Sequence, residues 1–152
     1  MDPMTPSPEE RVAELGLELP PLRRPAGHYR GWTTAGDVLH LAGQGADGHT
    51  GRLGADLGVD DGYAAARACA LNLLAQARDA VGSLDRVAQV LVLRGYVACT
   101  DDFVDQPAVI DGASDLLASV FGERGEHART AIGVRALPRG FAVELDAMLR
   151  VR

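Results

Sequence analysis

Two helix-forming stretches, each flanked by strand-forming stretches, limit what this chain can fold into. Apolar residues recur at helical spacing over residues 60–81 and again over 107–121, and each pattern ends at a glycine, Gly82 or Gly122. Between them, residues 87–97 are rich in β-branched and apolar side chains at odd and even positions alike, which is typical of a strand covered on both faces. The chain therefore predicts a sheet whose strands are connected through helices.

Four further strands are predicted outside this helix–strand–helix unit. Tyr29 to Thr34 and Val38 to Ala42 precede it, and two strands over about 129–136 and 141–151 follow it. The order is ββ–α–β–α–ββ. Because crossovers between parallel strands are right-handed, both long helices should lie on one face of a mixed sheet. The other face must meet solvent or another subunit, and the apolar character of the middle strand favours a homo-oligomer built through that face.

The chain before the first strand, residues 1–25, is predicted to be an N-terminal extension. Its first six residues form a loose start, and Ser7-Pro-Glu-Glu10 then predicts a short helix with a capping box. The proline-rich stretch 19–25 cannot continue that helix and should be extended. Residues 43–58 contain six glycines and form a long loop of the kind that often carries function.

Length and composition narrow the class of protein. At 152 residues the chain is expected to be a single domain, 1–152, that needs no metal or disulfide to hold its core. A net charge of −6 argues against nonspecific binding to nucleic acid or to an anionic membrane. All 15 basic residues are arginine, which excludes a Schiff-base lysine. Cys69 and Cys99 are predicted to be buried thiols, and the histidines do not have the spacing of metal ligands. No apolar run reaches membrane-spanning length, so a cytoplasmic protein is expected.

Arg129 and Glu144 are the candidate catalytic residues. The guanidinium fork of Arg129 can bind a carboxylate through two parallel hydrogen bonds, and Glu144 can orient that fork or handle a proton or a water. If the last two strands form a hairpin, matching their apolar rows puts both residues on one face. A turn near Arg139 still leaves Glu144 opposite about residue 133, about 13 Å along the strand from Arg129. A bulge, a different turn or a subunit boundary has to close that gap.

The motifs around these residues resemble the Rid (YjgF-type) family over about residues 26–152. The specific part is Ala128-Arg-Thr-Ala-Ile-Gly-Val-Arg-Ala-Leu-Pro138 followed by Val143-Glu-Leu-Asp-Ala147, with Leu41-Ala-Gly-Gln44 and Ala26-Gly-His-Tyr29 as support. The resemblance implies a fold like that of the Bacillus-type chorismate mutase: a two-layer α+β sandwich with a mixed sheet of the six-strand type and two long helices on one face. It also implies a homotrimer with three clefts between subunits. The longer N-terminus resembles a less characterised branch.

The same resemblance implies a chemistry and a set of site residues. In the family, the arginine matching Arg129 binds the carboxylate of a 2-imino or 2-enamino acid, and water then releases ammonia and leaves a 2-keto acid. The glutamate matching Glu144 helps to place or activate that water, and a cleft between subunits would relieve the distance problem. No cofactor and no metal is implied. The substrate-binding residues expected on this basis are Arg129, Tyr29, Gly43, Gln44, Asp111, Ala131 and His127.

Several positions depart from the family pattern. Ala131 stands where cysteine is common, which excludes thiol chemistry there, and His127 and His28 stand where prolines are usual. Either histidine could be a pH-sensitive site group. Asp111 stands where asparagine is common, and its negative charge would oppose an anionic substrate unless it pairs with an arginine or is protonated.

Plainer explanations exist for the same residues. Arg129 could form a surface or interface ion pair with Glu144 as its structural partner, and Tyr29 could be a core aromatic with one wet end. Asp111 could decorate its helix, and Gly43-Gln44 could be a backbone requirement at a strand end. Arg94, in an apolar strand, needs an anionic partner at an interface or in a cleft.

Three functions remain open on the sequence. The leading hypothesis is a deaminase or hydrolase of small 2-imino or 2-enamino acids that works in an intersubunit cleft. The alternative is a non-catalytic protein of the same fold that binds small carboxylate-bearing metabolites. The third is an endoribonuclease-type activity, against which the acidic charge and the 5% aromatic content speak. The expected partners are a small carboxylate and further copies of this chain, with no membrane and with nucleic acid disfavoured.

Overall fold

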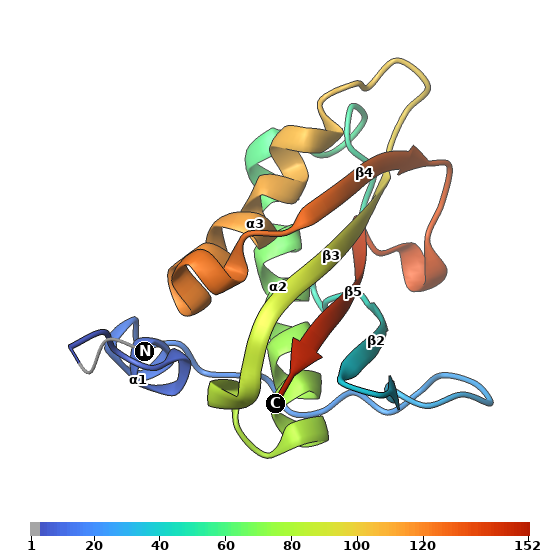
Figure 1. Ribbon diagram of the computed structural model, residues 1–152. Helices are drawn as coiled ribbons and strands as arrows, with labels where there is room; N and C mark the ends of the chain where they lie inside the picture. The colour runs from blue at the N-terminus through green and yellow to red at the C-terminus, as the bar shows by residue number, and fades with distance from the viewer. Residues whose placement is uncertain (1–3) are drawn as a thin grey trace.

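The strands form one mixed sheet in the computed structural model, which describes residues 4–152. The strand order is β1-β2-β5-β3-β4, with β5 in the centre and β4 at one edge (Figure 1). The pair β3–β4 is parallel, and the pairs β1–β2, β2–β5 and β3–β5 are antiparallel. The strands span β1 Trp32–Ala35, β2 Val38–Gln44, β3 Val87–Ala98, β4 Ala128–Val134 and β5 Val143–Val151.

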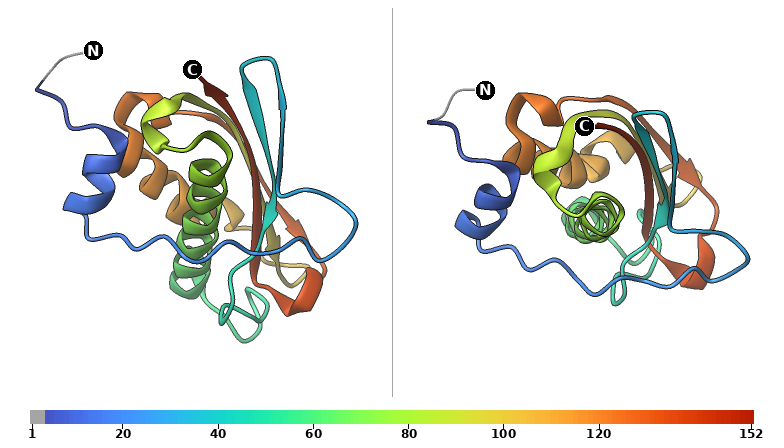
Figure 2. Two further views of the ribbon diagram at one scale, coloured as in Figure 1. Left: turned by 90° about the horizontal axis from the view of Figure 1, so that it is seen from below. Right: turned by 60° about the horizontal axis from the view of Figure 1, so that its bottom comes forward.

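Both long helices cover the same face of this sheet (Figure 2). They are α2 (Val59–Val81), which ends at Gly82 in a left-handed conformation, and α3 (Gln106–Phe121). Gly112 of α3 packs directly on the main-chain carbonyl of Tyr63 in α2, with no room for a Cβ atom. The predicted α+β class and the placement of both helices on one face are therefore confirmed. The sheet in the described residues has five strands, whereas the six-strand type was expected.

The core lies between the helices and the sheet. In β5, alternate side chains point into it and are almost fully buried, whereas Glu144, Asp146 and Met148 point to the other face and are only partly buried. Cys69 and Cys99 are free and buried, as predicted. Burial raises the pKa of the Cys69 thiol to about 12, which makes it unreactive near neutral pH.

The predicted hairpin between the last two strands does not form. Among residues 4–152, β4 pairs with β3 alone, and β5 lies on the other side of β3. In this register Leu93 of β3 aligns with Arg129 of β4 and with Ala147 of β5. Glu144 instead aligns with Tyr96 and Ile132, so it lies on the opposite face from Arg129. The expectation that Arg129 and Glu144 share a face was wrong, because it assumed that consecutive strands pair. Two strand spacings and three residues of offset separate their Cα atoms by about 14 Å within one chain.

The N-terminal extension is anchored to the body of the protein. Helix α1 (Pro8–Glu14) has the predicted capping box between Ser7 and Glu10. Glu9 accepts hydrogen bonds of 3.1 and 2.6 Å from Arg78 of α2, and one of 2.9 Å from the Leu84 N–H. The chain then runs across α2 to the β1 end of the sheet (Figure 2). Part of the predicted loose start, residues 1–3, lies outside the described residues.

Three short 3₁₀ turns complete the described structure: η1 Leu84–Arg86, η2 Gly122–Gly125 and η3 Pro138–Gly140. Within residues 4–152, no helix is both long and apolar enough to cross a membrane.

Candidate functional site

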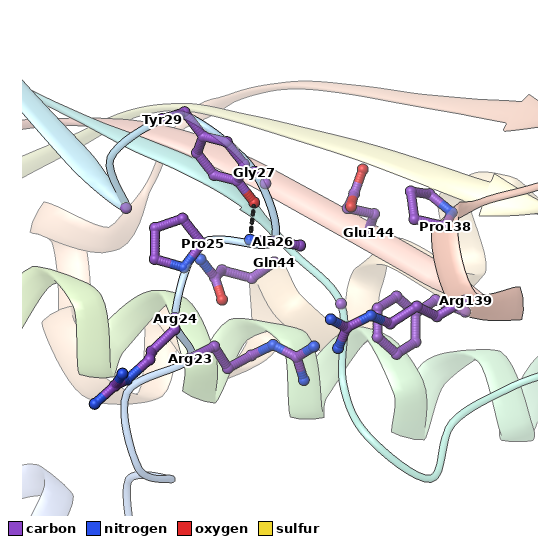
Figure 3. A pocket seen from close by; sticks show the side chains of 14 residues that line it. Arg23, Arg24, Pro25, Ala26, Gly27, Tyr29, Gln44, Pro138, Arg139 and Glu144 are labelled. Carbon is purple, nitrogen blue, oxygen red and sulfur yellow. Dashed lines mark hydrogen bonds between the residues drawn. The ribbon is translucent and has the colours of Figure 1, made fainter.

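A cavity of about 280 Å³ lies where the N-terminal segment, the end of β2 and the beginning of β5 meet (Figure 3). Four residues expected from the sequence line it, namely Tyr29, Gly43, Gln44 and Glu144. The turn before β5 contributes Pro138, Arg139 and Phe141, and the N-terminal segment contributes residues 23–27. These four predicted residues therefore lie around one cavity of a single chain.

Two glycines let the walls of this cavity approach one another closely. A Cβ atom on Gly43 would stand 3.2 Å from Cδ of Glu144, so the carboxyl group leans against the main chain of β2. A Cβ atom on Gly45 would overlap the ring of Phe141. Tyr29 is half exposed, and its hydroxyl oxygen accepts a hydrogen bond of 3.2 Å from the Ala26 N–H. That bond curls the segment 26–29 into the cavity wall.

Glu144 is the titratable group of the cavity with a displaced pKa. Burial raises the pKa of its carboxyl above the ordinary value, and the charge of Asp146 raises it further. Among the described residues, neither an arginine nor a histidine forms an ion pair with Glu144. A half-buried carboxyl of this kind holds and returns a proton more readily than an ordinary surface glutamate does.

Arg129 lies elsewhere, on the helix side of edge strand β4. Its Nη1 donates hydrogen bonds of 2.7 Å to Oδ1 of Asp111 and 3.2 Å to Oγ of Ser114, and its Nη2 donates one of 3.3 Å to the Pro107 carbonyl. The guanidinium is thereby fixed against α3. Asp111 is more than half exposed, so water or a second carboxylate can compete with it for the Arg129 guanidinium.

His127 belongs to the same cluster through Ser114. Its Nδ1 lies 2.6 Å from the Gly125 carbonyl, which can only accept, so Nδ1 carries the hydrogen in this contact. Nε2 lies 2.9 Å from Oγ of Ser114 and, in the neutral ring, accepts from that hydroxyl. His127 therefore supports Ser114, and Ser114 in turn accepts from Arg129. Ala131 follows on the same face of β4, where it aligns with Gly95.

The open face of the sheet carries a second polar cluster. Arg94 donates a hydrogen bond of 2.6 Å to Oδ1 of Asp146, and the hydroxyl of Tyr96 donates one of 3.0 Å to Oδ2. The anionic partner that Arg94 requires is therefore Asp146. Ile132 lies on this face with 45% of its surface exposed, which is high for an isoleucine in a sheet.

Most of the chain matches the model of a known family. Its model, described as "YjgF/chorismate mutase-like, putative endoribonuclease", matches residues 9–142. The chain belongs to this family. It is also 46% identical over 146 residues to Protein TCP17 of Trypanosoma cruzi, a match that covers 92% of this chain and 91% of that protein.

Solved structures divide YjgF-like relatives into near and distant ones. A protein of unknown function from Agrobacterium tumefaciens is 39% identical with a TM-score of 0.86, and the match covers 95% of this chain and 91% of that one. A "putative endoribonuclease" from Shewanella oneidensis is 34% identical with a TM-score of 0.92, covering 96% and 100%. RidA from a Psychrobacter species is 24% identical with a TM-score of 0.59, covering 86% and 94%, and shows the shared fold alone. This chain is therefore more similar to the Agrobacterium and Shewanella proteins than to RidA, which agrees with the less characterised branch that its longer N-terminus resembles.

The structure separates the predicted residues of this YjgF-like chain into two groups. Tyr29, Gly43, Gln44 and Glu144 share the cavity, whereas Arg129, Asp111, Ala131 and His127 cluster at β4 and α3. Sequence reasoning missed Arg23, Arg139 and Phe141 in the cavity wall. Arg139 could have been noticed, because it stands in a Pro-Arg-Gly turn next to the Glu144 strand. In the described residues, no group of three or more histidine, cysteine or acidic side chains is arranged to hold a metal ion.

Proposed function

We propose that this protein hydrolyses small 2-imino or 2-enamino acids to 2-keto acids and ammonia. The proposal rests on Glu144, which lies in a small cavity beside Tyr29 and Gln44. Its carboxyl is half buried, has a raised pKa and forms no ion pair in the described residues. Such a carboxyl suits proton transfer between water and a nitrogen leaving group. The sequence resemblance to the Rid family implies this chemistry, whereas the description of the matching family model names a putative endoribonuclease.

The reaction needs one water and no redox partner. Water adds to the imine carbon, and Glu144 takes a proton from that water. The carboxyl returns that proton to the nitrogen, which gives a carbinolamine. Glu144 then carries the remaining hydroxyl proton to the same nitrogen, the C–N bond breaks, and ammonia leaves while the carbon keeps the oxygen as a ketone. Arg129 holds the substrate carboxylate through its guanidinium fork, which fixes the imine carbon beside Glu144.

Arg129 and Glu144 have to come from different subunits for this to work. Within one chain they lie on opposite faces of the sheet and about 14 Å apart. A second copy that covers the open face, with its exposed Ile132, can bring its own Arg129 edge to the cavity of the first. We propose a homotrimer with three such clefts. The two buried free thiols suit a reducing compartment such as the cytoplasm.

The direct test generates an imine enzymatically and follows its loss. D-amino-acid oxidase acting on D-alanine supplies 2-iminopropionate, and semicarbazide traps whatever imine remains. The protein should accelerate imine loss, and Arg129→Ala should lower kcat/KM by about a hundredfold, because a bidentate charge-assisted contact is lost. Arg67→Ala, which removes an exposed arginine from α2, is the matched control and should leave the rate unchanged. No acceleration by the wild-type protein would reject the proposal.

One observation favours the alternative of a binder without turnover. Arg129 already donates to Asp111, Ser114 and the Pro107 carbonyl, so a ligand has to compete with these partners. Saturable binding of 2-oxobutyrate without imine hydrolysis would support a carboxylate-binding role. Endoribonuclease activity, which appears in the family description, would require RNA cleavage that Arg129→Ala abolishes.

A further inference from the structure

Two arginines that sequence reasoning overlooked face one another across the cavity wall. Arg23 comes from the N-terminal segment and Arg139 from the turn before β5, and their guanidinium groups point toward each other, whereas Arg24 points away (Figure 3). Both also line the neighbouring cavity at the N-terminal segment. Two like charges that converge at one place repel each other unless an anion lies between them.

The side chain of Arg23 is held in its position from several directions. Its guanidinium stacks over Phe141 with Cζ 5.2 Å from the ring centroid, and its Nη1 donates 2.9 Å to Oδ1 of Asp47. Its carbonyl accepts a hydrogen bond of 3.3 Å from Nε2 of Gln76, a buried side chain of α2. Asp47 is 84% exposed and occupies only one of the Arg23 donors, so the remaining N–H groups can bind a ligand.

Arg139 is held in an unusual conformation at the same place. Its φ of 58° makes it the single non-glycine residue with positive φ in residues 4–152. An asparagine or a glycine would adopt this conformation with less strain, so the backbone alone does not favour an arginine here. Within the described residues, Arg139 has no carboxylate partner. Backbone strain of this sort is concentrated at functional sites, and here it lies next to a cavity.

We infer that Arg23 and Arg139 bind a second acidic group of the substrate, so that the preferred substrate is a dicarboxylic 2-imino acid. This rests on the proposed function and refines it. The α-carboxylate goes to Arg129 of the neighbouring subunit, the imine carbon lies at Glu144, and the distal carboxylate lies between Arg23 and Arg139. A cavity of about 280 Å³ is at the small end for ligand sites and suits a diacid of about five carbons. The N-terminal extension thereby contributes to substrate choice, since it supplies Arg23.

The test compares two imines that differ in the distal carboxylate. L-glutamate oxidase supplies 2-iminoglutarate from L-glutamate, and D-amino-acid oxidase supplies 2-iminobutyrate from D-2-aminobutyrate. The wild-type protein should have a kcat/KM about tenfold or more higher for 2-iminoglutarate. Arg139→Gly should remove that preference by lowering kcat/KM for 2-iminoglutarate to about the value for 2-iminobutyrate. Glycine accepts the positive φ, so this variant should fold at least as well as the wild type. Equal kcat/KM values for the two imines in the wild type would overturn the inference and leave the proposed deaminase in place.

A binding measurement keeps the inference testable if no imine is hydrolysed. Calorimetric titration with 2-oxoglutarate and with 2-oxobutyrate probes the subsite without turnover. The wild-type protein should bind 2-oxoglutarate about tenfold more tightly, and both Arg139→Gly and Arg23→Gln should bring the two affinities together. Arg30→Gln, which changes an exposed arginine outside this cavity, should preserve the difference. Equal affinity of the wild type for both acids, or binding of neither, rejects the second acidic subsite.

Discussion

Arg129 donates a 2.7 Å hydrogen bond from Nη1 to Oδ1 of Asp111, so the proposed carboxylate anchor already holds a carboxylate of its own chain. This relationship explains how an aspartate can stand at a position where the resemblance to the Rid family predicts asparagine. The pair neutralises Asp111 in the absence of substrate, and an incoming carboxylate has to displace it.

Asp111→Asn should therefore improve substrate binding. The amide keeps an acceptor for Arg129 but removes the competing charge, and because the pair is partly exposed the gain should be about 1 kcal/mol or less, a severalfold decrease in KM. Steady-state kinetics with 2-iminopropionate measures it. Asp115→Asn, on an exposed position of the same helix, is the matched control. A KM that rises in Asp111→Asn would mean that Asp111 orients Arg129 for the substrate instead of competing with it.

Glu144→Gln should stabilise the protein at neutral pH while it abolishes hydrolysis. The pKa of Glu144 is raised in the folded state. Between the ordinary pKa of 4.5 and this raised pKa, the folded protein therefore binds more protons than the unfolded chain does. The free energy of unfolding consequently falls as pH rises through that window. Glutamine removes this penalty, which is at most about 1 kcal/mol for a partly exposed group. Urea titrations at pH 7 and at pH 4 should show a gain that shrinks at the lower pH. A variant less stable than the wild type at pH 7 would contradict the assigned direction.

Glu9→Gln should loosen the attachment of α1. Burial alone would raise the pKa of Glu9, but hydrogen bonds from Arg78 and from the Leu84 N–H outweigh it and leave the pKa lowered. Its contribution to stability is present above the ordinary value of 4.5 and is lost as pH falls through the lowered folded-state value. The expected cost near pH 7 is about 1 kcal/mol or less, because the pair is partly exposed. Denaturant midpoints at pH 7 for Glu9→Gln and for the exposed control Glu14→Gln should differ, and identical midpoints would refute the role of Glu9.

Gly45→Ala should destabilise the cavity wall. The added methyl group would overlap the ring of Phe141, which is itself held under Arg23, so the expected cost is about 1–3 kcal/mol of unfolding free energy. Gly27→Ala is the control, since its Cβ would meet the Tyr29 ring at an ordinary 3.5 Å. Thermal unfolding of the two variants compares them directly. Equal midpoints for both would show that Phe141 moves aside without cost.

The fold could be predicted from the sequence because its signals are local. Helical spacing over residues 60–81, the stop at Gly82 and the capping box at Ser7 each depend on neighbouring residues, and all three appear in the structure. The pairing of β4 could not be predicted in this way. The connection through α3 places β4 parallel to β3 at the edge of the sheet. The last strand, β5, then lies between β2 and β3.

The candidate site was predicted in its parts but not in its arrangement. Motif residues such as Gln44 and Glu144 meet in one cavity, because β2 and β5 are neighbours. Arg23 carries no local signal among 15 arginines, and the Pro-Arg-Gly turn around Arg139 does not indicate a partner. Their convergence depends on where the N-terminal segment crosses the sheet. Only the three-dimensional structure brings these two residues together.

If each catalytic site uses Arg129 from one subunit and Glu144 from another, mixing two inactive variants should restore activity. Arg129→Ala and Glu144→Gln should each be inactive alone. Co-refolding them in equal amounts should restore about a quarter of the wild-type activity, because random assembly gives that share of clefts both native residues. A mixture no more active than either variant alone, despite proven exchange of subunits, would contradict a shared site.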